Sequence, residues 1–353
     1  MRDKPFGGIF ICCSPILLIK DPEIIRDVMV KDFGTHFQNR LARAHETMDP
    51  LLFKNLFMAR EKGHQLSEVL NEKILEKGTK ISVTRLSAHL PDKSEYCKLV
   101  FKFHQNVNNG GDNQENGTEI FRPVFIKPEI CEFFRKVVWD VVEEREKKKM
   151  FRGDFMDLLI QLKNTGKIEE TDSVEEQAET NSLTYKKSMD PVLKNFQGDD
   201  FVAQIVLFFG AGFETSSTTA SFALFELAAN PEIQNKLIKE VDSTLVATEG
   251  KITYEAVQNM TYLDMVINET LRKYPPLATL DRECMKEYRN EKHNLVIEKG
   301  IPIMLSLFGQ HRDPKYFPDP ESFIPERFSE ENVKKIPRYV YMPFGEGPRN
   351  CIG

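Results

Sequence analysis

A glycine-rich loop surrounds a single cysteine at residues 343–353. The loop reads Pro343-Phe344-Gly345-Glu346-Gly347-Pro348-Arg349-Asn350-Cys351-Ile352-Gly353. Glycine has no Cβ and readily adopts positive φ, so a cysteine here can approach a flat macrocycle while backbone N–H groups point at its sulfur. Arg349 offers a planar pair of donors that suits a carboxylate. The pattern predicts that Cys351 is the thiolate axial ligand of a haem iron, and the alternative is a loop with a buried free cysteine.

The composition is that of an ordinary globular protein. Of the 353 residues, 41% are hydrophobic, and 48 basic against 54 acidic side chains give a net charge of −6. No basic stripe is interleaved with aromatic residues, so we expect no nucleic-acid partner. The six cysteines contain no C-x-x-C pair and are spaced irregularly, which argues against a secreted disulfide framework.

The dominant predicted element is a helix over residues 199–229. This stretch has no proline, and its middle is apolar nearly all round, from Ile205 to Phe209, as in a buried helix. A helix of about 30 residues is roughly 45 Å long, enough to cross a whole domain.

A polar segment lies inside this helix, and it reads Ala211-Gly212-Phe213-Glu214-Thr215-Ser216. Gly212 lowers helix stability by about 1 kcal/mol relative to alanine. Together with the Thr215 hydroxyl it is expected to loosen one turn and admit dioxygen and water. Thr215 and Glu214 are therefore candidates for proton transfer. The alternative is a helix with a Ser/Thr-rich face and a solvated glutamate.

Two further motifs contain arginine. Glu269 and Arg272 stand at positions i and i+3, on one helix face, where such pairs are usually solvated. The downstream segment Pro325-Glu326-Arg327-Phe328 can add Arg327 to a buried network, so we predict a structural triad. Arg282 is a second candidate partner for a haem carboxylate, and the alternative is a surface arginine.

The remaining segments predict helices joined by loops, with a few short strands. Residues 1–32 are expected to form a β-hairpin, turning at Ser14-Pro15, and a first helix that starts at Asp21-Pro22 and runs to about Val30. Periodic apolar positions predict further helices at 62–77, 133–149, 154–162, 231–246 and 262–273. Polar composition predicts exposed loops at 106–119 and 165–190, and short strands are expected within 277–306.

The motifs A-G-x-E-T-S, E-x-x-R, P-E-R-F and F-G-x-G-x-R-x-C-x-G, in this order, resemble those of cytochrome P-450, the haem-thiolate monooxygenases. The resemblance is nearly continuous over residues 201–353. The segments 317–323 and 343–353 are similar to the animal microsomal clan that holds insect detoxification enzymes. The resemblance implies a mainly α fold with a small β-sheet in one domain over residues 1–353, in which 262–353 form the core with the haem-ligand loop.

The resemblance also implies an activity. Members of this family insert one oxygen atom from O2 into small lipophilic substrates, xenobiotics or endogenous lipids, at haem b. The electrons come from NADPH through a flavoprotein reductase, with cytochrome b5 as a second candidate donor. Such an unspecific monooxygenase is expected on the cytosolic face of the endoplasmic reticulum membrane, in microsomes, with a role in detoxification.

The same resemblance implies roles for individual residues. Cys351 is the metal ligand, Thr215 with Glu214 serves oxygen activation, and the structural triad consists of Glu269, Arg272 and Arg327. Haem contacts are expected from Arg282, Phe344, Gly345, Arg349 and Gly353. The substrate pocket is expected to be largely apolar, with a lining of Phe208, Phe209, Ala211, Leu277, Thr279 and Leu280.

The sequence departs from the family pattern in three places. No membrane anchor is present, the only tryptophan, Trp139, lies in a charged helix rather than in a Trp-x-x-x-Arg motif, and the chain stops two residues after Cys351. We therefore expect a partial chain, incomplete at both ends. The alternative functions are an inactive partial chain, a non-catalytic haem-binding remnant, or a haem-free helical interaction protein.

Overall fold

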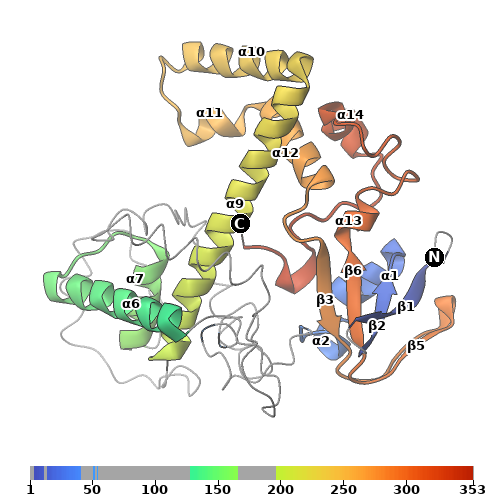
Figure 1. The fold of residues 1–353 in the computed structure, drawn as a ribbon, viewed down its shortest axis with the longest axis horizontal. Helices are drawn as coiled ribbons and strands as arrows, with labels where there is room; N and C mark the ends of the chain where they lie inside the picture. Colours follow the sequence, from blue (N-terminus) through green and yellow to red (C-terminus); the bar gives the residue numbers. More distant parts are fainter. Residues whose placement is uncertain are drawn as a thin grey trace, which may run out of the picture. The chain divides into compact units, whose positions relative to one another are not determined.

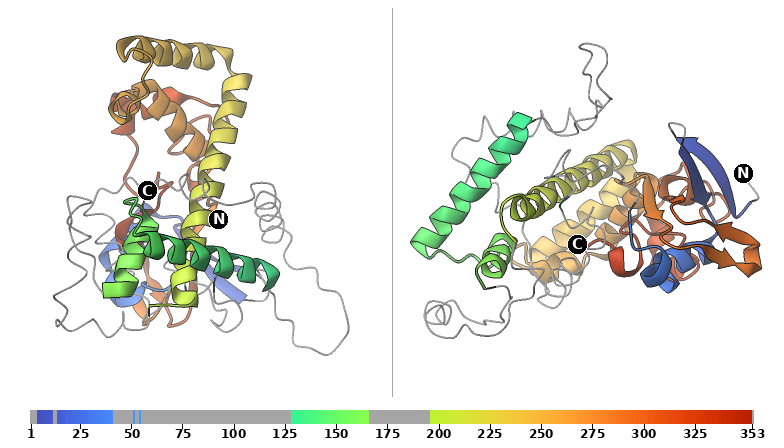
Figure 2. Two further views of the ribbon diagram at one scale, coloured as in Figure 1. Left: turned by 90° about the vertical axis from the view of Figure 1, so that its left-hand side faces the viewer. Right: turned by 90° about the horizontal axis from the view of Figure 1, so that it is seen from below.

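The computed structural model describes residues 4–11, 14–40, 51, 54, 128–165 and 196–352. The helix predicted at 62–77, the loop at 106–119 and nearly all of the loop at 165–190 lie outside the described residues. The chain divides into two compact units. The first contains Met1–Leu41 and Glu214–Cys351, and the second contains Ala42–Phe213. Figures 1 and 2 show the ribbon of the helices and strands in the two units.

A four-stranded sheet organises the first unit. Its strands are β1 (Phe6–Ile11), β2 (Ser14–Ile19), β6 (Pro302–Ser306) and β3 (Thr279–Glu283), in the order β1-β2-β6-β3. β2 pairs antiparallel with β1 and parallel with β6, and β3 pairs antiparallel with β6. A separate two-stranded sheet joins β4 (Tyr288–Asn290) to β5 (Leu295–Ile297) through the 3-10 turn η5 (Glu291–His293).

The expected turn at Ser14-Pro15 is wrong, because both residues lie in β2, opposite Ile11 and Phe10 of β1. Proline was read as a turn residue because it cannot donate a main-chain hydrogen bond. Here β2 pairs with β6 only from Leu17 onward, so one side of Pro15 has no ladder to interrupt.

The first helix begins as predicted and then changes character. Asp21 caps α1 (Pro22–Arg26) by accepting from the backbone N–H groups of Glu23 and Ile24, at 2.9 and 3.3 Å. The chain continues as a π-helical turn, η1 (Asp27–Lys31), and then as α2 (Phe33–His36). Within η1 the N–H of Asp32 donates to the carbonyl of Asp27 over 2.8 Å. A 3.6-residue apolar pattern does not signal such a turn.

The buried faces of α1 and η1 pack with the sheet in one hydrophobic core. It includes Ile24, Ile25, Val28 and Met29 from the helical segment together with Ile19, Ile303 and Leu305 from β2 and β6. This core fixes the position of η1, the turn that contacts the cysteine loop.

The long helix α9 (Asp199–Ala229) has the bounds that the sequence predicts. It is α-helical throughout, so Gly212 does not open the loosened turn that was expected. The following helices are α10 (Pro231–Ala247), α11 (Tyr254–Gln258) and α12 (Thr261–Lys273), and the sequence reasoning missed α11. Short helical turns complete the first unit: α13 (Leu307–Gln310), η6 (Pro325–Phe328), α14 (Glu330–Val333) and η7 (Gly347–Arg349).

A buried carboxylate joins the end of α9 to the end of α12. Glu226, 3% exposed, accepts from Lys273 Nζ at 2.7 Å and from the Tyr274 hydroxyl at 2.6 Å. Burial and this carboxylate raise the pKa of Tyr274 to about 12. The tyrosine ring also stacks on Phe222, with ring centroids 4.2 Å apart.

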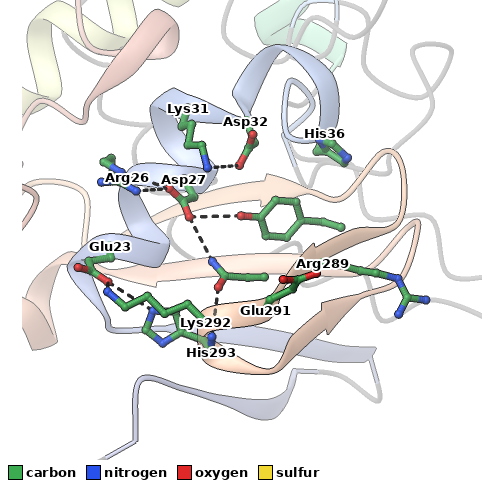
Figure 3. Close-up of a pocket in the computed structure, with 12 residues that line it drawn as sticks. Glu23, Arg26, Asp27, Lys31, Asp32, His36, Arg289, Glu291, Lys292 and His293 are labelled. Atoms are coloured by element: carbon green, nitrogen blue, oxygen red, sulfur yellow. Dashed lines mark hydrogen bonds and ion pairs between the residues drawn. The ribbon is translucent and has the colours of Figure 1, made fainter.

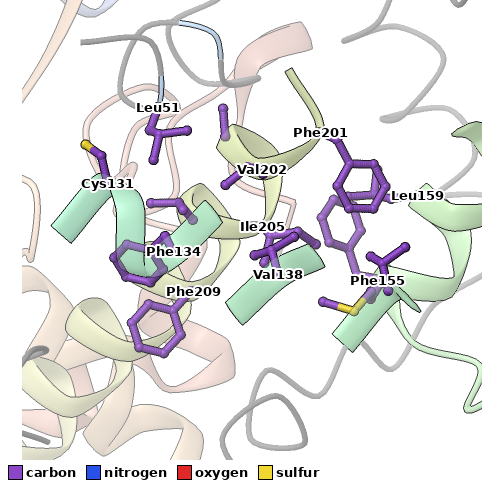
Figure 4. Packing of buried hydrophobic residues seen from close by; sticks show 14 of the residues in the cluster. Leu51, Cys131, Phe134, Val138, Phe155, Leu159, Phe201, Val202, Ile205 and Phe209 are labelled. Carbon is purple, nitrogen blue, oxygen red and sulfur yellow. The ribbon is translucent and has the colours of Figure 1, made fainter. Parts of the chain in front are cut away.

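The second unit is a helical cluster of α6 (Pro128–Lys148), α7 (Phe155–Thr165) and the start of α9. Its core contains Phe134 and Val138 of α6, Leu159 of α7 and Ile205 of α9 (Figure 4). Within the described residues, no helix has both the length and the apolar character needed to cross a membrane.

A buried ion network closes the link between α6 and α7. Arg145 donates to Asp154 at 2.6 and 2.8 Å and to Asp157 at 2.7 Å. The other Asp157 carboxylate oxygen accepts from the backbone of Arg152 and Gly153, at 2.6 and 2.8 Å. Because each carboxylate has partners, the network can be buried without a large desolvation penalty.

Candidate functional site

The cysteine loop is closed by main-chain hydrogen bonds. The N–H of Cys351 donates to the carbonyl of Phe344 over 2.7 Å, and the N–H of Gly345 donates to Met342 over 3.0 Å. Gly345 and Gly347 have φ angles of 74° and 75°, a conformation that favours glycine. The Cys351 side chain is exposed, so it differs from the buried, inert cysteine of the alternative reading.

Gly347 brings the loop against the π-helical turn. A Cβ atom at this position would lie 2.0 Å from the carbonyl oxygen of Met29 and 3.0 Å from its carbonyl carbon. The loop and η1 are therefore packed backbone to backbone, which only a glycine permits. The π-helical turn thus supports the loop that carries Cys351.

Arg282 is a buried cation, and two of its donor nitrogens lack an acceptor among the described residues. Its side chain is 1% exposed, and Nη1 donates to the carbonyl of Asp281 at 2.6 Å. Among the residues that the structure describes, Nε and Nη2 have no hydrogen-bond partner. Burial, followed by the repulsion of Arg40, lowers the pKa of Arg282 to about 9. A buried guanidinium with unused donors is costly, and a carboxylate ligand would satisfy it. The residue therefore fits a haem propionate.

Arg349 and Arg40 complete an arginine cluster around Arg282. Burial and the repulsion of Arg40 lower the pKa of Arg349 to about 10, and Arg349 in turn contributes to lowering that of Arg282. Sequence reasoning missed Arg40, because its spacing from Cys351 follows no motif. A phosphate or carboxylate site often gathers several arginines, but only the fold shows that these three are neighbours.

The predicted triad residues meet in the first unit. Glu269 and Arg272, both fully buried, form a two-pronged pair over 2.7 and 2.8 Å. Glu269 Oε1, which accepts from Arg272 Nη2, also accepts from the N–H of Ile324 at 2.9 Å. Arg327 Nε lies 3.5 Å from this oxygen, an ion-pair distance without a hydrogen bond, and Arg327 donates instead to the carbonyl of Asp319 at 2.8 Å.

His311 connects this pair to the cysteine loop. Its carbonyl accepts from Arg272 Nη1 at 3.0 Å, and its ring Nε2 accepts from the N–H of Met342 at 3.1 Å. Met342 in turn accepts from Gly345. The side chain is fully buried, and burial with the nearby Arg272 lowers its pKa to about 4. A neutral imidazole therefore orients the segment at Met342 that leads into the loop.

Comparison with known proteins now identifies the family. The cytochrome P450 family model matches residues 18–353. This chain belongs to the cytochrome P450 family. The resemblance seen in the sequence is thus confirmed, as is a mainly α fold with a small sheet. Cytochromes P450 are haem-dependent monooxygenases, which matches a buried arginine with unused donors in the same unit as an exposed cysteine.

Several insect cytochromes P450 are similar over nearly the whole chain. Cytochrome P450 6k1 of Blattella germanica is 39% identical over 99% of this chain and 75% of its own length. Cytochrome P450 9e2 of the same organism is 35% identical over 100% of this chain and 76% of its own. Probable cytochrome P450 6d4 of Drosophila melanogaster is 36% identical, with 98% and 75% covered.

The other expected site residues of this cytochrome P450 lie in different settings. Glu214 and Thr215 are exposed on α9. In the first unit Leu277 is 45% exposed, whereas Leu280 is buried in the core of the sheet. In the second unit Phe209 is buried, while Phe208 is half-buried and stacks on Phe155, with ring centroids 3.8 Å apart.

A polar pocket of about 620 Å³ lies elsewhere in the first unit (Figure 3). It is lined from α1, η1, α2 and the β4–β5 turn, and none of the expected site residues lines it. Its charges pair with one another, Lys292 with Glu23 and Arg26 with Asp27. This pairing favours a structural role.

The stability of this cytochrome P450 is expected to fall in acid through His311. Below pH 6.5 the unfolded histidine binds a proton that the folded one, with its pKa of about 4, does not bind. The neutral imidazole therefore contributes about 3 kcal/mol to the free energy of unfolding. This contribution is complete above pH 6.5 and is lost as the pH falls toward 4. Urea unfolding at several pH values measures this contribution to the free energy of unfolding.

The control is His311→Gln, which keeps an acceptor for Met342 and does not titrate. The free energy of unfolding of this variant should fall less between pH 6.5 and 4, by the same amount. Equal losses in both proteins would contradict the assignment.

Proposed function

We propose that this chain is a haem-thiolate monooxygenase that inserts one oxygen atom from O2 into small lipophilic substrates. The proposal is carried by two features of the first unit: a glycine-rich loop that exposes Cys351, and a buried Arg282 whose Nε and Nη2 find no partner in the described part of the chain. A thiolate ligand and a carboxylate clamp are what haem b needs from a protein. Family membership supports the same reading.

Haem, when bound, supplies the dioxygen chemistry. Cys351 would hold the iron, and the rigid loop would fix the direction of its sulfur. Arg282 and Arg349, joined by Arg40, would bind the two propionates. Phe344 and Gly345 would shape the surface around the sulfur, and the expected haem contact of Gly353 lies outside the described residues. Glu269, Arg272 and Arg327 would act structurally, by holding the segments that carry the loop.

Two residues of α9 would take part in proton transfer. Thr215 would hold a proton at its hydroxyl oxygen, and Glu214 would exchange one with solvent from its exposed carboxylate. The substrate would contact the largely apolar set predicted above: Phe208, Phe209, Ala211, Leu277, Thr279 and Leu280. In this proposal the two units belong to one catalytic domain.

Electrons would come from NADPH through a flavoprotein reductase, with cytochrome b5 as a second donor. The similarity to insect cytochromes P450 supports xenobiotics or endogenous lipids as substrates and a role in detoxification. It also supports residence on the cytosolic face of the endoplasmic reticulum membrane, as a microsomal protein.

The test is turnover of the purified, haem-loaded chain with NADPH, a flavoprotein reductase and an alkoxycoumarin probe. We expect dealkylated product that depends on the reductase. Thr215→Ala should lower product formation roughly tenfold or more while NADPH is still consumed, because proton delivery fails. Thr215→Ser keeps the hydroxyl and should retain most product. Haem binding without any reductase-dependent product would instead favour the non-catalytic, inactive alternative.

A further inference from the structure

A buried aspartate begins the π-helical turn. Asp27 is the first residue of η1 and is 5% exposed. Its carbonyl accepts from the N–H of Asp32, and its carboxylate oxygen Oδ1 accepts from Nε and Nη2 of Arg26 at 3.2 and 2.8 Å. The Arg26 side chain is 45% exposed, so this pair lies at the solvent boundary, where ion pairs contribute little.

The other carboxylate oxygen of Asp27 is bound by the β4–β5 hairpin. Oδ2 accepts from Nδ2 of Asn290 at 3.1 Å and from the hydroxyl of Tyr288 at 3.4 Å (Figure 3). Both donors lie on β4. Burial, aided by the Asp27 carboxylate, raises the pKa of Tyr288, so its hydroxyl keeps the proton that it donates. One oxygen thus receives two hydrogen bonds from a single strand.

The two donors are themselves held in place. Oδ1 of Asn290 accepts from the N–H of His293 at 3.2 Å, so both ends of this amide are used. Tyr288 is 6% exposed, and its ring packs edge-on against Phe37 with ring centroids 5.0 Å apart. Because the donors are fixed before they meet the carboxylate, little conformational entropy is lost in forming the link. The hairpin can therefore hold η1 at Asp27.

The π-helical turn passes this constraint to the cysteine loop. Two residues after Asp27, the carbonyl oxygen of Met29 lies where a Cβ on Gly347 would come within 2.0 Å of it. Backbone meets backbone at this point, so no side chain can change its rotamer to absorb a shift of η1. The loop continues from Gly347 to Cys351, whose N–H donates to Phe344. The direction of the sulfur thus depends on where η1 is held.

We propose that Asp27 is a positioning residue for the haem ligand: bound by the β4–β5 hairpin, it fixes η1, and η1 fixes the loop from which Cys351 presents its sulfur. The proposal rests on the function proposed above and adds a hairpin and a carboxylate to the machinery that holds the thiolate. Asp27 is not a catalytic residue, because it acts through η1 and Gly347.

The first test is the carbon monoxide difference spectrum of the reduced, haem-loaded chain. Asp27→Asn places an amide nitrogen or a single shared oxygen among the donors of Asn290, Tyr288 and Arg26. The fraction of haem with a band typical of thiol ligation should rise roughly threefold or more, because a buried hydrogen bond to a charged acceptor is lost. Cys351 itself is unchanged, so the spectrum reports its position.

An exchange of the two side chains tests the hydrogen bond directly. The double variant Asp27→Asn with Asn290→Asp keeps the total charge and reverses the donor and the acceptor. It leaves an oxygen at residue 27 for Arg26 and an oxygen at residue 290 for the N–H of His293. The thiolate-type band should therefore return to near the wild-type fraction in this double variant.

The second test needs no haem. In the haem-free chain, hydrogen exchange at the Cys351 amide measures how often the hydrogen bond to Phe344 opens. We expect exchange about tenfold faster in Asp27→Asn, the usual effect of losing one buried hydrogen bond to a charged group. The exchange double variant should be close to the wild type.

Two controls separate positioning from a general loss of stability. Glu226→Gln alters another buried carboxylate of the first unit, which binds Lys273 and Tyr274 and is 3% exposed. It should lower the urea midpoint without changing the spectrum. Arg26→Gln removes only the partly exposed partner of Asp27 and should change neither the spectrum nor the exchange rate.

Three results would overturn the inference: an unchanged spectrum and exchange rate in Asp27→Asn, a double variant no better than the single one, or an equal spectral change in Glu226→Gln. If Asp27→Asn does not fold, Tyr288→Phe keeps the ring and removes one donor, and it should show the same changes at a smaller size. A wild-type chain without a thiolate-type band would overturn the proposed function, and hydrogen exchange would still decide whether Asp27 positions the loop.

Discussion

Gly347→Ala is expected to displace the cysteine loop and abolish haem incorporation. The new Cβ would lie 2.0 Å from the Met29 carbonyl oxygen and 3.3 Å from a methyl group of Val30. The clash is with backbone, which belongs to a π-helical turn anchored in the core of the sheet, so a rotamer change cannot relieve it. Overpacking costs about 1–3 kcal/mol or more, and the φ of 75° adds about 1–2 kcal/mol for a residue with a Cβ.

Gly300→Ala is the matched control for this prediction. Gly300 has a φ of 83°, similar to that of Gly347, but a Cβ there would meet nothing within 4 Å. It should therefore show only the conformational cost. Urea unfolding of the haem-free chain and the haem content after expression measure the difference. Equal losses in the two variants would show that the contact between the loop and η1 is not what requires glycine.

Glu269→Gln should prevent the chain from accumulating as a folded protein. The substitution leaves the Arg272 guanidinium fully buried without its carboxylate, and it weakens the ion pair with Arg327. Breaking a buried pair by removing one partner costs about 3–5 kcal/mol, a large share of the 5–15 kcal/mol that stabilises a typical domain. Because His311 connects Arg272 to Met342, the loss should reach the cysteine loop as well.

Glu326→Gln is the comparison variant for Glu269. Glu326 lies on η6 close to the triad, but its carboxylate is 44% exposed and pairs with Lys236 on the surface. Its loss should hardly change the urea midpoint, because exposed ion pairs contribute little. The soluble yield and the urea midpoint of both variants decide the point. If Glu269→Gln unfolds at the same urea concentration as Glu326→Gln, the buried triad does not hold this fold together.

Local signals in the sequence predicted the elements that depend on neighbouring residues. The cap at Asp21-Pro22, the proline-free run of α9 and the start of α10 after Asn230 all lie where the sequence indicates. The approach of Glu269 and Arg272 was also predictable, because i and i+3 share a helix face in any α-helix.

The features that were missed depend on tertiary packing. The π-helical turn η1 keeps an apolar face, so its periodicity looks like that of an α-helix. The five-residue α11 is too short to show a clear period. Pro15 looks like a turn residue in the sequence. Only the sheet pairing shows that it can lie in β2, because β6 pairs with β2 from Leu17 onward and not at Pro15. Arg40 lies near Arg282 because the segment around residue 39 runs beside β3 in the fold, although the two are more than 200 residues apart in the sequence.

The most direct test of the central claim is the carbon monoxide difference spectrum of the dithionite-reduced, haem-loaded chain, compared with that of Cys351→Ser. Ligation by the Cys351 thiolate predicts a Soret band shifted far to the red in the wild type and absent in the variant. A wild-type band at the position typical of histidine- or thiol-ligated haem would contradict the account, as would a red-shifted band that persists in Cys351→Ser.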